Sequence, residues 1–235
     1  YQLAGPPHRY EWDVLQSGFL GQSDNVVFRL EAYTEPGFSS DRQQQAYVAA
    51  QTYPLRVRGS QVRVLSGTQA IANALVVRIP ARSQRGVTYA DANGVPFRTD
   101  AQGYLAGQGQ IRIGDRLVAL APVTATDVYT LYFTNAAPTV AGLDAPAVTA
   151  LGVQTLTVSA AHPLLLFNLD VSLQWDARQD ADFLSQLAYD LKRTSELLYD
   201  WSNGQAALGD VRVHHARAQW ETADVRLYAS NRLRP

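Results

Sequence analysis

Short runs in which apolar and polar residues alternate recur within the first 135 positions, a pattern typical of β-strands with one solvated face. The segment NVVFRLEAY at 25–33 alternates in this way before the turn Glu35-Pro36-Gly37. Further short β-rich runs, separated by turn residues, occupy 61–65, 74–79, 104–113, 116–121 and 128–135. This spacing predicts an antiparallel β-sandwich rather than βαβ units.

The period changes to that of a helix near residue 180. Apolar residues recur at helical spacing between residues 183 and 201 and predict one long amphipathic helix. Asp180 and Asp182 are both suitable N-caps, and Asn203-Gly204 is a suitable stop because glycine adopts the left-handed conformation without a Cβ clash. Strands are predicted before this helix at 153–159 and 164–175, and after it at 209–214 and 223–229.

These elements predict a mainly β fold with an α/β C-terminal part. We expect four segments: a strand-containing extension at 1–54, a β-sandwich at 55–135, a linker rich in Ala, Pro and Thr at 136–151, and a strand–long helix–strand–strand segment at 152–235.

The C-terminal segment predicts a partner surface, because a helix with a broad apolar face and two strands with open edges cannot bury themselves alone. We expect this partner to be the remainder of the same polypeptide or another copy of the chain. The residues expected to face it are Phe183, Leu184, Leu187, Leu191, Leu198 and Trp201 on the helix, with Val225 and Leu227 on the last strand.

Charge and hydropathy narrow the choice of partners. The net charge of −1 provides no electrostatic attraction to nucleic acid, and the longest apolar run, at 160–169, is too short to span a bilayer. The chain has no cysteine, which excludes disulfides and thiolate sites and fits an exposed or oxidising location. It also has no methionine, so we expect a processed product or a missing original N-terminus. We expect the protein to be exported, to an extracellular or cell-surface location.

Candidate chemistry is sparse. His214 and His215 are adjacent in a predicted strand and would point to opposite faces, so one metal ion cannot readily engage both. Asp176, Asp180 and Asp182 do not form a calcium-binding loop, and capping explains the last two better. We expect no catalytic residue, no metal ligand and no cofactor within this sequence.

Several aromatic residues are also compatible with a surface that binds glycans or peptides. These residues are Trp12, Tyr33, Tyr47, Tyr89 and Tyr104. Scattered aromatic residues in a sandwich usually fill the core or an edge, which is the alternative reading.

The run VRVLSGTQAIANALVVRI, followed by FRTDAQGY and IRIGDRLVAL, resembles a carboxypeptidase-regulatory-like domain, a transthyretin-like β-sandwich. The matching positions are Thr99, Asp100, Gly103 and Tyr104 in the central motif and Gly114 and Asp115 in a later turn. The resemblance covers about residues 55–135, and the longer segment 83–98 departs from the minimal pattern. It implies a spacer, scaffold or adhesive role.

The helix end LLYDWSNGQ, the strand GDVRVHH and the later ADVRLYAS resemble the start of a zincin-type metallopeptidase-like domain, as in the N-terminal domain of calcium-activated chloride channel regulators. The aligned positions are Tyr199, Gly209, Val211, Val213, Trp220, Ala223, Asp224 and Val225. In that family the His-Glu-x-x-His helix lies further along the chain. This sequence has no such motif, so no residue inherits a zinc-binding or general-base role.

Three functions therefore stay open. The first is a non-catalytic structural or interaction module of an exported, surface-associated protein. The second is the N-terminal fragment of a secreted zinc metallopeptidase whose His-Glu-x-x-His helix lies outside this sequence. The third is a glycan- or peptide-binding β-sandwich.

Overall fold

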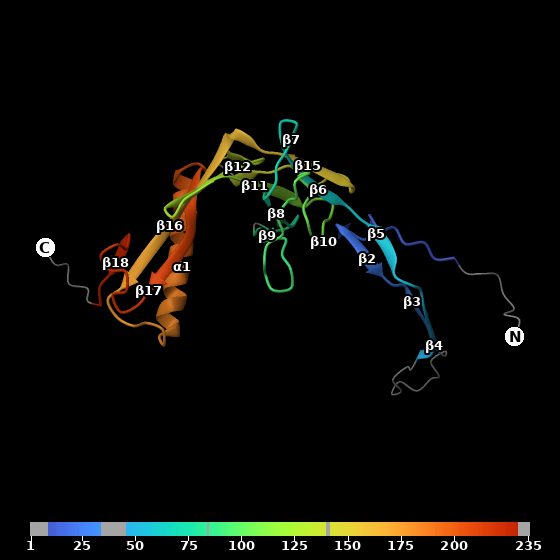
Figure 1. Ribbon diagram of the computed structural model, residues 1–235, viewed down its shortest axis with the longest axis horizontal. Helices are drawn as coiled ribbons and strands as arrows, with labels where there is room; N and C mark the ends of the chain where they lie inside the picture. Colours follow the sequence, from blue (N-terminus) through green and yellow to red (C-terminus); the bar gives the residue numbers. More distant parts are fainter. Residues whose placement is uncertain (1–8, 34–45, 84, 140–141, 230–235) are drawn as a thin grey trace, which may run out of the picture.

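The computed structural model describes residues 9–33, 46–83, 85–139 and 142–229. Its largest unit is a seven-stranded sheet with the order β17-β16-β12-β11-β8-β9, in which β18 also pairs with β16. These strands are β8 (Leu75–Ile79), β9 (Val87–Thr88), β11 (Arg116–Ala125), β12 (Tyr129–Thr134), β16 (Ser159–Leu173), β17 (Ala206–His214) and β18 (Val225–Leu227). Figure 1 shows this sheet running from the centre of the molecule to its C-terminal end.

A second, three-stranded sheet covers one end of the first and completes the sandwich. It consists of β6 (Gln61–Ser66), β7 (Gln69–Ala70) and β15 (Val153–Thr157), with β15 parallel to β6. The core between the sheets forms because inward positions on each strand are apolar, and Val62, Val64, Val76, Leu117 and Leu156 are all buried there.

The turn of the Thr-Asp-x-x-Gly-Tyr motif lies beside this core. The Asp100 carboxylate accepts hydrogen bonds from the backbone N–H groups of Gln102 (2.9 Å) and Tyr104 (2.8 Å). Gly103 has a φ of +81°, and a Cβ at this position would lie 2.5 Å from the Val64 carbonyl oxygen. Only glycine therefore fits without a shift of the backbone.

The N-terminal residues enter the sandwich and then leave it as a ribbon. β1 (Phe19–Leu20) pairs with β10 (Gly109–Gln110), and Leu20 is buried in the main core. The chain then forms a two-stranded antiparallel ribbon of β2 (Gln22–Val26) with β5 (Leu55–Arg58) and β3 (Arg29–Tyr33) with β4 (Ala46–Gln51). The ribbon therefore crosses the boundary predicted at residue 54.

Residues 136–151, expected as a linker, contain the strands β13 (Ala137–Thr139) and β14 (Gly142–Asp144). Ala145 packs in a small cluster with Ile79 and Val118, and Val148 is buried in the main core.

The helix α1 (Ala181–Trp201) follows β16 and returns along the sheet to β17. Its N-cap is Asp180, whose carboxylate accepts the Phe183 N–H (3.0 Å). At the other end, Gly204 has a φ of +79° and donates to the Tyr199 carbonyl (2.7 Å). Both helix ends thus agree with the sequence prediction.

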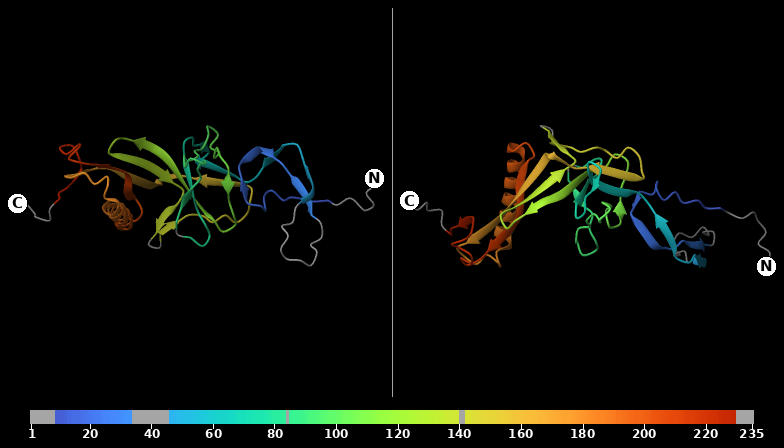
Figure 2. Two further views of the ribbon diagram at one scale, coloured as in Figure 1. Left: turned by 90° about the horizontal axis from the view of Figure 1, so that it is seen from below. Right: turned by 45° about the horizontal axis from the view of Figure 1, so that its top comes forward.

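Strand β16 belongs to both halves of the molecule. Its first part pairs with β12 of the sandwich, and its last part lies between β17 and β18, parallel to both. Fifteen residues of strand extend over about 50 Å. The sandwich and the helical end therefore share one sheet, as Figure 2 shows from two further directions.

The fold class is confirmed: the chain is mainly β, with one long helix between strands and mostly antiparallel sheets. Two strand predictions were wrong in detail. Segment 25–33 is broken at Val27–Phe28 into β2 and β3, because three consecutive apolar residues interrupt the alternation. Segment 104–113 contains the two-residue β10 and isolated bridges at Tyr104 and Leu105, because Gly107 weakens the strand and a turn at Gly114 ends it.

Candidate interaction surfaces

The predicted partner-facing residues fall into two groups. Phe183, Leu184, Leu187 and Leu227 are partly buried against Val171, Leu173 and Ala177 of the chain's own α/β end. Leu191 and Leu198 are half-buried, whereas Val225 is 37% exposed and Trp201 is 80% exposed. The first turns of the helix therefore already have a partner within the chain, and Trp201 at its last turn does not share that packing.

The outer edge of β17 is partly occupied by the helix that precedes it. The Ser195 hydroxyl accepts the Leu208 N–H (3.0 Å), and the Ser202 hydroxyl accepts the Ala206 N–H (2.9 Å). Two backbone donors that an added strand would use are thus already bonded, which leaves the first half of this edge a poor template for strand addition.

The side chains that suggested metal binding have separate roles. His214 Nε2 lies 2.8 Å from Asp170 Oδ1, while His215 Nδ1 accepts the Ala177 N–H (3.3 Å). A hydrogen bond from Arg178 lowers the pKa of the exposed Asp176 carboxyl. Within the part of the chain that the structure describes, no three His, Asp or Glu side chains gather in a group that could hold a metal ion.

The aromatic residues considered for ligand binding are dispersed. Tyr89 is buried in the main core, and Tyr104 is half-buried with the guanidinium of Arg63 5.1 Å from its ring centroid. The Trp12 ring meets the Phe28 ring edge-to-face, with centroids 5.4 Å apart. The side chains of Tyr33 and Tyr47 lie outside the described residues.

The contact between Trp12 and Phe28 belongs to a groove on the N-terminal ribbon, a surface that the sequence reasoning missed. The groove has a volume of about 890 Å³. Its lining residues are Tyr10, Trp12, Val26, Val27, Phe28, Arg29, Leu30, Ala50, Gln51 and Thr52. Leu30 is 73% exposed and Tyr10 is 82% exposed, so large apolar side chains stand in solvent here. The signal in the sequence was the run Val26-Val27-Phe28, because three consecutive apolar residues cannot all lie on the buried face of one strand.

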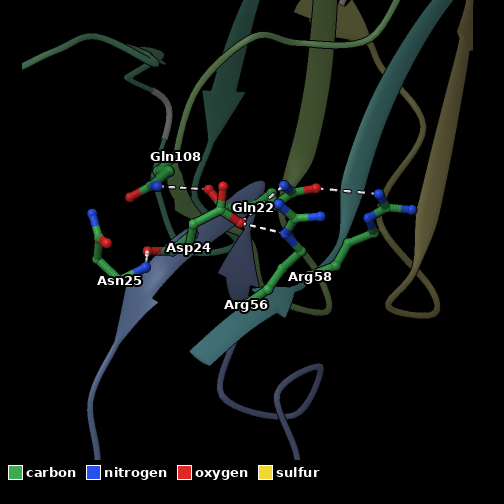
Figure 3. Close-up of polar contacts among 7 residues, drawn as sticks. Gln22, Asp24, Asn25, Arg56, Arg58 and Gln108 are labelled. Atoms are coloured by element: carbon green, nitrogen blue, oxygen red, sulfur yellow. Dashed lines mark hydrogen bonds and ion pairs between the residues drawn. The ribbon is translucent and has the colours of Figure 1, made fainter. Parts of the chain in front are cut away.

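Polar side chains hold the ribbon together where it leaves the sandwich, as Figure 3 shows. Arg56 Nε lies 2.6 Å from Asp24 Oδ1, and Arg58 donates to the Gln22 side chain (3.2 Å). Gln108 of the sandwich donates to the Gln22 carbonyl (2.6 Å). The hydrogen bond from Arg56 lowers the pKa of the Asp24 carboxyl, but this pair is exposed and contributes little to stability.

Beyond the groove, the ribbon is a pair of strands without a third. Each of its strands pairs with one other, β2 with β5 and β3 with β4, among the residues that the structure describes. Two-stranded ribbons are at best marginally stable in water unless another strand or an apolar layer covers them. This ribbon therefore has both the exposed apolar side chains and the incomplete pairing of an interaction surface.

The whole chain has far more surface than a compact monomer. Its solvent-accessible area is 16945 Å². A compact monomer of 25.8 kDa exposes about 10,500 Å². Figure 1 shows that the described residues form an arch with the ribbon at one end and α1 at the other, a shape that exposes more surface than a globule. The helix in the described residues is not apolar enough to cross a membrane.

Searches of protein-family models, of curated proteins and of solved structures each found no match to this chain. Both resemblances noted in the sequence therefore stay predictions, and the interaction surfaces have to be interpreted from their own geometry.

Proposed function

We propose that this chain is a structural, protein-binding module of an exported, surface-associated protein, and that it associates with a second copy of itself through the groove on the N-terminal ribbon. The exposure of Leu30 and Tyr10 beside the Trp12–Phe28 pair carries the proposal. Soluble proteins rarely leave such apolar patches open unless a partner covers them.

The charges of the ribbon favour a second copy as the partner. In its described part and the segment before it, four arginines are balanced by four carboxylates. These residues are Arg9, Arg29, Arg56 and Arg58, and Glu11, Asp13, Asp24 and Glu31. Two such surfaces do not repel each other, and a two-fold arrangement would place the same apolar groove on both sides of the contact.

A dimer formed through the ribbon would need a contact of ordinary size. A standard interface buries about 800 Å² on each partner. In such a dimer, the ribbon of the second copy would also provide the covering layer that a two-stranded ribbon lacks.

Sedimentation velocity over a range of protein concentrations tests the proposal. We expect a monomer–dimer equilibrium that Leu30→Asp weakens by at least about tenfold, because a carboxylate would be buried in the contact. The matched control is Val95→Asp, which changes an apolar residue of similar exposure (59%) in a sandwich turn and should leave the equilibrium unchanged. A chain that stays monomeric at every concentration, or equal weakening by both variants, would contradict the proposal.

A further inference from the structure

Three arginine side chains from separate segments line one cavity at the end of the sandwich. The cavity has a volume of about 570 Å³ and lies between the end of β8, the loop after it and the turn that precedes β11. Its lining residues are Arg78, Pro80, Ala81, Arg82, Gln110, Arg112, Ile113 and Asp115. Its volume is within the range typical of small-molecule sites.

The single carboxylate of this cavity is already engaged. Asp115 is buried, and its Oδ1 accepts the Ala81 N–H (3.2 Å) while its Oδ2 accepts the Arg112 N–H (2.9 Å). Arg78 Nη1 is 3.7 Å from Oδ2, at the edge of an ion pair. Asp115 therefore holds the surrounding backbone in place and neutralises at most one of the three guanidinium groups.

Arg78 is held in position, whereas Arg82 and Arg112 have no carboxylate partner among the described residues. The Arg78 side chain is 21% exposed and donates to the Gln110 carbonyl (2.9 Å), which fixes its direction. In the described ranges, neither Arg82 nor Arg112 forms an ion pair with a carboxylate, and both are exposed. Three guanidinium groups beside one carboxylate leave the cavity with an excess of positive charge.

We propose that this cavity binds a small ligand that carries an oxyanion, such as a phosphate or sulfate group. Planar guanidinium groups suit such oxygens because each can donate two parallel hydrogen bonds. Arg78 is the anchored donor of the site, and Arg82 and Arg112 close on the anion from the solvent side. The site is separate from the ribbon, so its occupancy does not depend on self-association.

Isothermal titration of the full chain with inorganic phosphate, and separately with a sugar phosphate, tests the proposal at constant ionic strength. We expect saturable binding of at least one of the two. Comparison of the two affinities shows whether the site prefers free phosphate or a phosphate group carried on a sugar. We expect the double variant Arg82→Ala/Arg112→Ala to weaken this binding by about tenfold or more, because it removes two charged donors.

The control is Arg85→Ala, which removes an equally exposed arginine of the same loop that does not line the cavity. This variant should bind within about twofold of the parent chain. Since the three altered arginines are exposed, circular dichroism should show the parent fold in every variant. No saturable binding of either probe, or equal weakening by the control, would overturn the proposal.

Discussion

The side-chain oxygen of Asn168 accepts a hydrogen bond from the backbone N–H of Asp210 (3.1 Å) at the bulge where β17 meets β16. The amide nitrogen of Asn168 donates to the Thr126 carbonyl (3.3 Å), and its backbone N–H donates to the Val128 carbonyl (2.8 Å). One residue therefore links the end of the sandwich to the first strand after the helix. A β-bulge needs such a partner because it leaves a residue out of the ladder.

Replacing this residue with alanine should lower the free energy of unfolding by about 1–2 kcal/mol, since two side-chain hydrogen bonds are lost and the Asp210 N–H loses its acceptor. Denaturant titration measures the change. The control Gln154→Ala also removes an amide with a backbone partner, the Ala150 carbonyl, but it leaves no strand N–H without an acceptor and should cost about 0.5 kcal/mol or less. Equal losses in the two variants would contradict the linking role of Asn168.

The Leu173 side chain is fully buried between the sheet and the helix. Leu173→Ala should therefore lower the free energy of unfolding by about 2–5 kcal/mol. The small number of buried residues at this end leaves few others to fill the cavity. Leu197→Ala on the exposed side of the helix (37% exposed) is the control and should have a much smaller effect. Thermal or chemical unfolding of both variants measures these losses. A loss below about 1 kcal/mol for Leu173→Ala would show that the helix does not depend on this core.

Loss of the N-cap should unwind the first turn of α1. We expect Asp180→Ala to lower the unfolding free energy by about 1 kcal/mol, because the Phe183 N–H would lose its acceptor. Asp182→Ala, which removes only an exposed charge from the same turn, should cost about half as much or less. A larger loss for Asp182→Ala than for Asp180→Ala would show that the charge near the helix dipole, rather than the cap, stabilises this end of the helix.

High pH should reveal two tyrosines that ionise late. Burial raises the pKa of Tyr89 to about 12 despite the nearby Arg78, and burial together with Asp200 raises the pKa of Tyr199 to about 12. Below about pH 10 these tyrosines are protonated in both the folded and the unfolded chain. Above it only the unfolded chain releases the protons, so stability should fall as the pH rises from 10 towards 12.

Absorbance at alkaline pH measures this directly. In the folded chain we expect a late step of tyrosine ionisation, from Tyr89 and Tyr199, that disappears in denaturant. Ionisation of the more buried Tyr89 should reduce the unfolding free energy by up to about 1.4 kcal/mol per pH unit across that window, and the half-buried Tyr199 should contribute less because water screens its charge. A single transition in the folded chain would show that water reaches both hydroxyl groups.

The sequence was informative wherever local chemistry determines the structure. The alternation of β6, the Asp180 cap and the Asn203-Gly204 stop all depend on neighbouring residues, and each was predicted. The pairing of β16 with strands on both sides was not, because register between distant strands depends on tertiary packing rather than on local pattern.

The candidate surfaces were harder to predict for the same reason. Phe183 and Leu187 follow the helical period, but only the fold shows that they pack on their own sheet. Arg78 and Arg112 are separated by thirty-three positions of sequence and meet only because the turn at Asp115 returns to β8. Trp12 and Phe28 likewise come from different segments, so the groove between them has no continuous motif.

A second copy that covers the ribbon should protect its backbone amides from exchange, and hydrogen–deuterium exchange at several protein concentrations tests this directly. As concentration rises, we expect peptides from residues 26–30 and 49–53 to become more protected. Core amides such as that of Leu105, which donates to the Val62 carbonyl (2.9 Å), should exchange at the same rate throughout. Ribbon peptides that exchange equally fast at every concentration would contradict the account.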